Sequence, residues 1–296
     1  MALNLSILRT RALSAAVFVV IMLAGLLWSP WSFFVLFSII HFGCWREYQK
    51  IIALIDTDYA TITPFHRYGV MLAGWCLMFY FFNDRYAIGG ISLHAIGWWA
   101  GLAFIFVLPA GEILLSRRLQ LKNIGYSFLG LLYISLSWGL LTNLRSAYAG
   151  TALEFLGEFF AASIVFSIWI NDTMAYIVGS LIGKTPFSKI SPKKTWEGTL
   201  GGIVLAILVM GVAGYFFGYK VNNSWDWDAI WPWMIVAAIS SVAGTFGDLL
   251  ESKLKRMAGI KDSGQLMPGH GGFLDRFDSL LLATPFVWLF LEWMMR

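Results

Sequence analysis

The residues best suited to chemistry lie in a polar block near the C-terminus. Ten of the 38 charged residues fall between Asp248 and Asp278, together with the glycine-rich segment Pro268-Gly-His-Gly-Gly272. Charge next to long apolar segments is costly unless it serves a purpose. Carboxylates, cations and glycines in one segment indicate a site that handles a metal ion and phosphates.

The carboxylates predict a hard-cation site. Asp248 and Asp275 are the first expected ligands, joined by Asp172 or Asp278. Asp172 lies in the middle of an apolar segment, where a carboxylate costs about 2.5–3.5 kcal/mol, so it needs a cavity or a partner. A structural hydrogen bond between helices is the alternative reading. The oxygen ligands favour Mg²⁺, with a second cation left open, over zinc, since His270 is the histidine in this block and no cysteine is close.

The same block offers groups for binding anions. Its glycines, Gly271 among them, permit positive φ and close backbone approach, so that successive N–H groups can form an anion-binding nest. Lys255, Arg256 and Lys261 can neutralise phosphate charge. Basic residues at a membrane edge also set topology, and we favour that reading for Lys253.

A second polar segment carries Lys193, Lys194 and Thr195 within Ser191-Pro-Lys-Lys-Thr-Trp-Glu-Gly198. These side chains can reach phosphates, and Glu197 at the start of the next helix suits the helix dipole.

The elements that must position these groups are membrane spans. The chain is 58% hydrophobic and only 13% charged, which is typical of an integral membrane protein. We expect an all-α polytopic bundle in one transmembrane domain, residues 1–296, with N-terminal spans in 1–123 and the catalytic spans and loops in 124–296. Nine spans are predicted, with eight as the alternative: 12–28, 30–45, 68–83, 91–115, 124–142, 159–182, 197–219, 231–250 and 279–295. The first run follows Arg9 and Arg11 and is read as a retained span rather than a signal peptide, because no cleavage site follows it.

The loops test this assignment through their charge. Seventeen of the 21 Lys and Arg residues fall in alternate loops on one side of the predicted spans, which places the N-terminus and both polar segments in the cytoplasm. Cys44 and Cys76 lie within apolar stretches and are expected to be small buried side chains.

The motifs resemble those of the phosphatidate cytidylyltransferases, or CDP-diacylglycerol synthases. The resemblance rests on Ser252-Lys-Leu-Lys-Arg256, Lys261-Asp262 and Pro268 to Asp278, and extends to Ser191–Gly198, Asp172–Tyr176 and Gly247–Ser252. Met267 stands where that family usually has Leu, Ile or Phe. The resemblance covers roughly residues 125 to 296.

This resemblance implies transfer of CMP from CTP to phosphatidic acid, giving CDP-diacylglycerol and pyrophosphate, in a polar cavity that contains a metal and opens to the cytoplasmic side. Substrate-binding roles then fall to Ser191, Lys193, Thr195, Ser252, Asp262, His270, Gly271 and Arg276. Catalytic roles fall to Asp172, Lys194, Asp248, Arg256, Lys261, Asp275 and Asp278, of which Asp172, Asp248 and Asp275 are the metal ligands.

The expected partners are CTP and membrane phosphatidic acid, with no nucleic acid and with a homodimer left open. The expected location is the bacterial inner membrane. Two other functions remain open: a CTP-dependent transferase for another lipid, such as an ether lipid or a polyprenol, and an ion-coupled transporter. A transporter predicts paired interrupted helices in two related halves, and no such repeat is found in the sequence.

Overall fold

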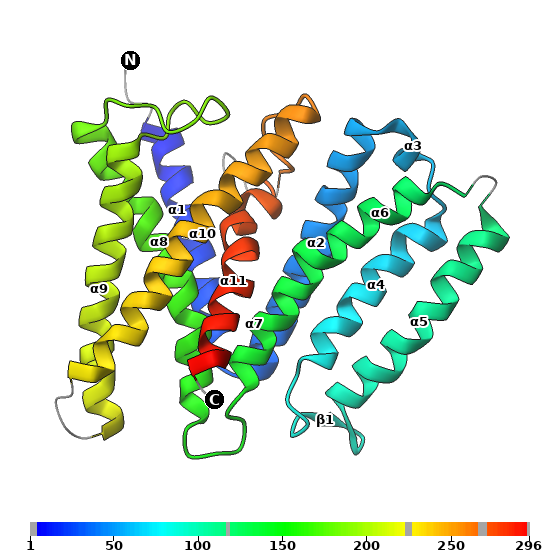
Figure 1. Cartoon of the computed structure of the whole chain (residues 1–296), viewed down its shortest axis with the longest axis horizontal. Coiled ribbons are helices and arrows are strands. Elements are labelled where there is room, and N and C mark those ends of the chain that lie inside the picture. The colour runs from blue at the N-terminus through cyan, green and yellow to red at the C-terminus, as the bar shows by residue number, and fades with distance from the viewer. Residues whose placement is uncertain (1–4, 117–118, 223–226, 266–270, 295–296) are drawn as a thin grey trace. The chain divides into compact units, whose positions relative to one another are not determined.

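The computed structural model describes residues 5–116, 119–222, 227–265 and 271–294, which are almost entirely helical (Figure 1). Each of the nine predicted spans falls on a helix or on a continuous helical segment. The long helices are α1 (Leu5–Leu27), α2 (Pro30–Ile55), α4 (Pro64–Tyr80), α5 (Leu93–Leu115), α8 (Glu154–Ile182), α9 (Trp196–Asn222), α10 (Ile230–Met257) and α11 (Leu274–Met294). A composite segment joins α6 (Leu121–Gly130), the π-helix η1 (Leu131–Leu136) and α7 (Ser137–Ser146). The short elements are α3 (Thr57–Ala60), η2 (Trp227–Ala229) and a hairpin of β1 (Ala87–Ile88) with β2 (Ile91–Ser92).

Six helical segments of the described chain are long and apolar enough to cross a membrane: α5, α6 to α7, α8, α9, α10 and α11. The spans predicted on α1, α2 and α4 are not among them. α4 has 17 residues, and α2 carries Arg46, Glu47 and Lys50 in its second half. The membrane character is therefore supported, whereas the count of nine spans stays a prediction.

The chain divides into two compact units. The first combines Met1–Glu158 with Leu254–Phe277, and the second combines Phe159–Lys253 with Asp278–Arg296. Each is described by itself below.

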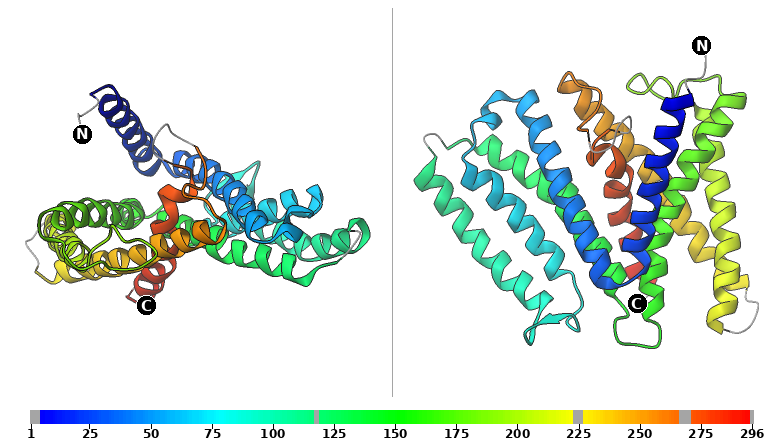
Figure 2. Two further views of the ribbon diagram at one scale, coloured as in Figure 1. Left: turned by 90° about the horizontal axis from the view of Figure 1, so that it is seen from above. Right: turned by 180° about the vertical axis from the view of Figure 1, so that it is seen from behind.

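The first unit is built around helices from the N-terminal half. α1 and α2 form a hairpin, seen from behind in the right panel of Figure 2, and Ser29 caps α2 by accepting a hydrogen bond from the Ser32 N–H. Buried polar groups join α2 to η1. The Ser135 hydroxyl lies 3.0 Å from His41 Nε2 and accepts a hydrogen bond from the Trp45 indole. Such paired groups avoid the cost of burying unsatisfied polar atoms.

The second unit depends on close helix approach. A Cβ at Gly202 of α9 would lie 2.6 Å from the Asn171 carbonyl oxygen of α8, and a Cβ at Gly247 of α10 would lie 2.5 Å from the Asp278 carbonyl oxygen of α11. Small residues thus let these backbones touch, as is common between membrane helices. Ser240, Gly244 and Gly247 of α10 are all buried.

Candidate active site

In the second unit, the loop between α8 and α9 is held in a fixed shape. Glu197, in the first turn of α9, accepts hydrogen bonds from the Thr185 hydroxyl at 2.8 Å and from the backbone N–H groups of Lys184 and Thr185. Thr195 caps α9 through the Gly198 N–H, and its backbone bridges to Pro186. The predicted phosphate-binding segment is therefore anchored at its C-terminal end.

This loop places the ammonium group of Lys194 next to the carboxylate of Asp248. The ammonium of Lys194 lies 2.7 Å from Asp248 Oδ2 of α10, and both side chains remain about 30% exposed. Asp172 of α8 interacts electrostatically with both Lys194 and Asp248. Three of the predicted residues, separated by 76 positions in sequence, are thereby brought together.

Two further carboxyl groups, those of Glu251 and Asp278, belong to the same group of interacting acids. Asp278, the fifth residue of α11, is buried and interacts electrostatically with Asp248, Glu251 and Asp172. Its Oδ1 accepts a 2.6 Å hydrogen bond from the Ser279 N–H. Four carboxyl groups therefore influence one another in surroundings where burial makes like charges costly.

In the first unit, the described ends of the loop between α10 and α11 converge on Asp275. Its Oδ2 accepts hydrogen bonds from the Gly272 N–H at 2.7 Å and the Ser263 N–H at 2.8 Å, and its Oδ1 lies 2.5 Å from the Lys255 ammonium. Gly271, at φ +78°, has a left-handed backbone, and a Cβ there would lie 2.6 Å from Asp275 Oδ2. The predicted need for glycine is confirmed at this position.

Glu47 of α2 is a residue of this region to which the sequence analysis assigned no role. Its Oε1 accepts the Phe273 N–H at 2.9 Å, and its Oε2 accepts the Leu274 N–H at 2.8 Å, so it caps the start of α11 from a distant helix. The Ser263 hydroxyl lies between two acids, 2.6 Å from Glu47 Oε2 and 2.8 Å from Asp275 Oδ2.

The remaining predicted residues are less tightly engaged. Lys193, Lys261 and Asp262 are exposed, and Ser191, Ser252 and Arg276 are half-buried. Arg256 is exposed and its guanidinium lies 3.3 Å from the Ile260 carbonyl oxygen. His270 lies outside the described residues.

The donor set fits a hard divalent cation. Asp172 and Asp248 supply carboxylate oxygen, and the buried Asp278 interacts electrostatically with both of them. Within the described ranges, no three His, Cys, Asp or Glu side chains already form a ligand cluster. Mg²⁺ usually takes one or two protein carboxylates and completes its shell with water and substrate phosphates.

The chain belongs to the cytidylyltransferase family, whose model matches residues 9–294. Among its curated relatives is the phosphatidate cytidylyltransferase of Staphylococcus saprophyticus, 35% identical over 185 residues, which are 62% of this chain and 65% of that protein. The enzymes of the same name from Staphylococcus haemolyticus and Staphylococcus epidermidis are 34% and 36% identical over the same shares of each chain. The match therefore spans slightly less than two thirds of these relatives.

Proposed function

We propose that this chain is a phosphatidate cytidylyltransferase, which transfers CMP from CTP to phosphatidic acid and releases pyrophosphate. The observation that carries the proposal is the Lys194–Asp248 pair beside Asp172, a cation and carboxylates held together by a fixed loop. The family match and the names of the relatives support the same reaction.

The residues divide by charge. Lys193, Lys194 and Thr195 would contact phosphates of CTP, with Ser191 orienting the loop. Asp248 and Asp172 would hold Mg²⁺, which when bound neutralises phosphate charge and orients the triphosphate. Asp278 would keep these acids in place from its buried position.

The loop between α10 and α11 would supply the other groups. Arg256, Lys261 and Arg276 would neutralise substrate phosphates, with Ser252, Asp262, His270 and Gly271 orienting them. Asp275 is proposed as a further metal ligand, for which its Oδ1 would exchange the Lys255 ammonium for the cation. Its Oδ2 would keep its backbone hydrogen bonds.

No dedicated general base is needed in this mechanism. The attacking group is a phosphate monoester, whose second pKa is about 6, so it is largely ionised at neutral pH. Catalysis then consists of positioning and charge neutralisation, the task for which lysines, arginines and a metal ion are suited. The bacterial relatives support an inner membrane location, and the charge pattern of the loops supports placing these residues on its cytoplasmic side.

The test is pyrophosphate release from CTP by the purified full-length protein, with phosphatidic acid and Mg²⁺. Asp248→Asn should lower kcat by about a hundredfold or more, the scale of losing one preorganised charged group. Asp84→Asn, an exposed carboxylate bonded to the Ser92 hydroxyl, is the matched control and should keep full activity.

Other outcomes would redirect the proposal. Turnover with a different lipid acceptor alone would keep the chemistry and change the substrate. Lack of any turnover in the folded wild-type protein, with every acceptor, would reject the transferase.

A further inference from the structure

A cavity of about 610 Å³ lies within the first unit, between α4, α5 and the segment formed by α6 and η1. None of its lining residues is assigned above to nucleotidyl transfer. Its volume falls within the range of about 300–1,000 Å³ that is common for small-molecule sites. Leu131, the first residue of the π-helix η1, contributes to the wall, and π-helical turns are frequent at functional sites.

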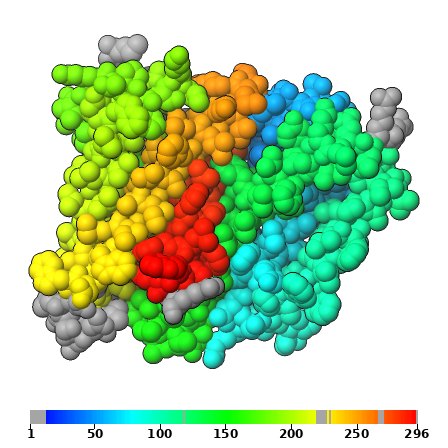
Figure 3. Space-filling view, viewed as in Figure 1, coloured from blue at the N-terminus to red at the C-terminus, as the bar shows by residue number. Residues whose placement is uncertain are grey.

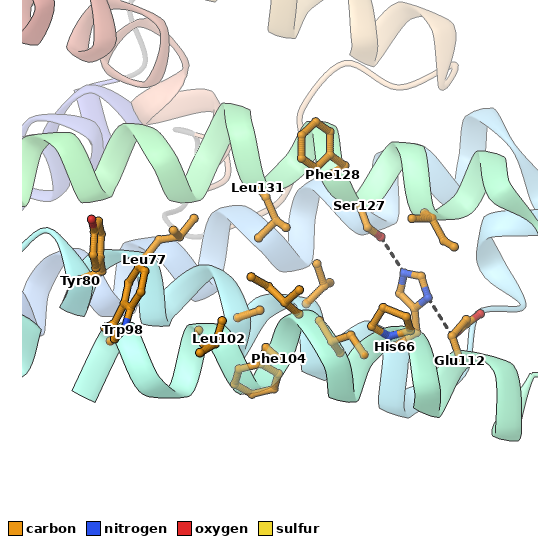
Figure 4. A pocket seen from close by; sticks show the side chains of 18 residues that line it. His66, Leu77, Tyr80, Trp98, Leu102, Phe104, Glu112, Ser127, Phe128 and Leu131 are labelled. Carbon is orange, nitrogen blue, oxygen red and sulfur yellow. Dashed lines mark hydrogen bonds and ion pairs between the residues drawn. The ribbon is translucent and has the colours of Figure 1, made fainter. Parts of the chain in front are cut away.

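One end of the cavity is polar. His66 Nε2 lies 2.8 Å from the Ser127 hydroxyl, and His66 Nδ1 lies 3.0 Å from Glu112 Oε2 (Figure 4). The Tyr59 hydroxyl lies 3.0 Å from the same Ser127 oxygen. These four side chains come from α3, α4, α5 and α6, and all are buried.

The rest of the cavity wall is apolar. Figure 4 shows Leu102 and Leu131 between the polar end and the opposite end, where Tyr80 and Trp98 lie. The rings of Tyr80 and Trp98 are 5.8 Å apart, and Trp98 is 49% exposed. Trp and Tyr are common at the interface between membrane and water.

The location of the cavity argues for a lipid occupant. α5 and the α6 to α7 segment are both candidate spans, and the apolar window of α5 is only 6% buried within the structure. Its side chains form an outer surface in the space-filling view (Figure 3). An apolar cavity beside such a helix favours hydrocarbon over water, which needs polar partners to be held.

The polar end selects the headgroup. Glu112 Oε2 is buried and accepts no hydrogen bond from any described residue, although it lies 3.0 Å from His66 Nδ1, and His66 Nε2 is engaged by the Ser127 hydroxyl. The available group is therefore an acceptor, which suits a hydroxyl donor. The unpartnered Glu112 carboxylate disfavours a phosphate at this end of the cavity. Arg67, the neighbouring cation on α4, interacts electrostatically with Tyr59, and its guanidinium lies 3.5 Å from the Ala60 carbonyl oxygen. Lys122, the cation on α6, is already engaged by Asp56 and Asp58.

We propose that this cavity binds a neutral lipid with a free hydroxyl, of the monoacylglycerol class. Its acyl chain lies along the apolar wall and its hydroxyl donates to the Glu112 carboxylate, whose Oε2 has no hydrogen-bond partner among the described residues. The site is separate from the proposed nucleotidyl transfer, and its chemistry disfavours the anionic lipid that serves as substrate there.

The experiment is photo-crosslinking of the full-length protein in detergent with a monoacylglycerol that carries a diazirine in its acyl chain, followed by peptide mass spectrometry. Crosslinks are expected on lining residues of α4 and α5, such as Val70 and Leu102. Unlabelled monoacylglycerol should compete about tenfold better than the same lipid with its hydroxyls methylated, the expected scale of one hydrogen bond to a charged group. Lysophosphatidic acid should compete no better than the methylated lipid.

Two variants on α5 locate the ligand. Gly101 lines the cavity, and a Cβ there would lie 4.0 Å from the Cys76 Cβ, an ordinary contact, so Gly101→Leu should fill the cavity without a backbone clash. It should reduce crosslinking about tenfold. Ala103 is exposed on the same helix, and Ala103→Leu is the matched control, expected to crosslink as the wild type does.

Three results would overturn the proposal. They are equal crosslinking of the Gly101→Leu and wild-type proteins, equal competition by the methylated lipid, and stronger competition by lysophosphatidic acid than by monoacylglycerol. If Gly101→Leu fails to fold, the competition series in the wild-type protein decides alone.

Discussion

Two carboxylates, Glu47 and Asp275, share the hydrogen-bond donors at the start of α11. Glu47 takes the backbone N–H groups of Phe273 and Leu274, and Asp275 takes those of Gly272 and Ser263. Buried backbone donors left without acceptors cost about 1–3 kcal/mol each, so these acids stabilise the loop as well as any ligand they bind. Both roles have to be separated when variants of Asp275 are interpreted.

A substitution at Gly271, compared with a matched control, can separate the structural role of Asp275 from its role in ligand binding. Gly271→Ala should lower Tm and pyrophosphate release together, because the left-handed backbone costs about 1–2 kcal/mol with a side chain and the new Cβ would displace the Asp275 carboxylate. The matched control is Gly259→Ala, at φ +70°, where a Cβ meets no atom within 4 Å among the described residues. It should show the backbone cost alone, measured by thermal unfolding in detergent. Equal loss of activity in both variants would contradict a role for Asp275 geometry.

Sequence reasoning could find Asp248, Asp275 and Lys194 because charge stands out in apolar surroundings and the motifs are compact. It assigned no role to Glu47, whose partners lie more than 200 positions away. A glutamate in the polar second half of α2 was the available signal, since burial of such a group requires partners. Which partners it has depends on tertiary contacts that no local pattern contains.

At the scale of helices, packing in the second unit is controlled by single glycines. Gly244 and Gly247 lie one turn apart on α10, yet only the second touches backbone closely. A Cβ at Gly247 would lie 2.5 Å from the Asp278 carbonyl oxygen, whereas a Cβ at Gly244 would lie 3.4 Å from its nearest neighbours. The tighter contact involves the backbone of Asp278, so a shift of this backbone would also move the Asp278 carboxyl group.

Gly247→Ala is accordingly expected to destabilise the protein by about 1–3 kcal/mol, the usual cost of overpacking, since helix backbone is the clashing group. Gly244→Ala should be neutral or slightly stabilising, because alanine favours the helix and its contacts are ordinary. Thermal unfolding of both variants in detergent checks the difference. Similar Tm values for the two would show that α11 can move away at no cost.

Helix positions were predictable and some of their ends were not. Apolar windows located every long helix, since a span needs about 20 apolar residues. The helix predicted at 30–45 continues to Ile55, because hydropathy falls at Arg46 and Glu47 while helix geometry does not. The π-helical turn at 131–136 had no sequence signal of its own.

At the scale of the whole chain, the distribution of charge leads to a prediction about sidedness. Asp84 precedes and Lys189 follows three candidate spans, those of α5, α6 to α7 and α8. An odd number of crossings puts the two positions on opposite sides of the membrane. Lysine and arginine bias then puts Lys189 in the cytoplasm.

A thiol-labelling experiment tests this arrangement. Cys44 and Cys76 are buried, and both Asp84 and Lys189 are exposed, so the variants Asp84→Cys and Lys189→Cys should give low background. In intact spheroplasts, a membrane-impermeant maleimide should label Asp84→Cys and spare Lys189→Cys until the membrane is permeabilised. The reverse pattern would invert the proposed orientation, and labelling of both in intact cells would remove one of the three spans.

The long-range cap by Glu47 has a consequence for biosynthesis. Glu47 leaves the ribosome 216 residues before Ser263, and the segment between them includes the Phe159–Lys253 part of the second unit. During translation the Glu47 acceptor on α2 is made before its donors, and the helices from α3 to α10 are synthesised in between. The capping of α11 by Glu47 is thus a late step. A ribosome that stops before residue 263 leaves a chain with the helices up to α10 but without most of the loop between α10 and α11.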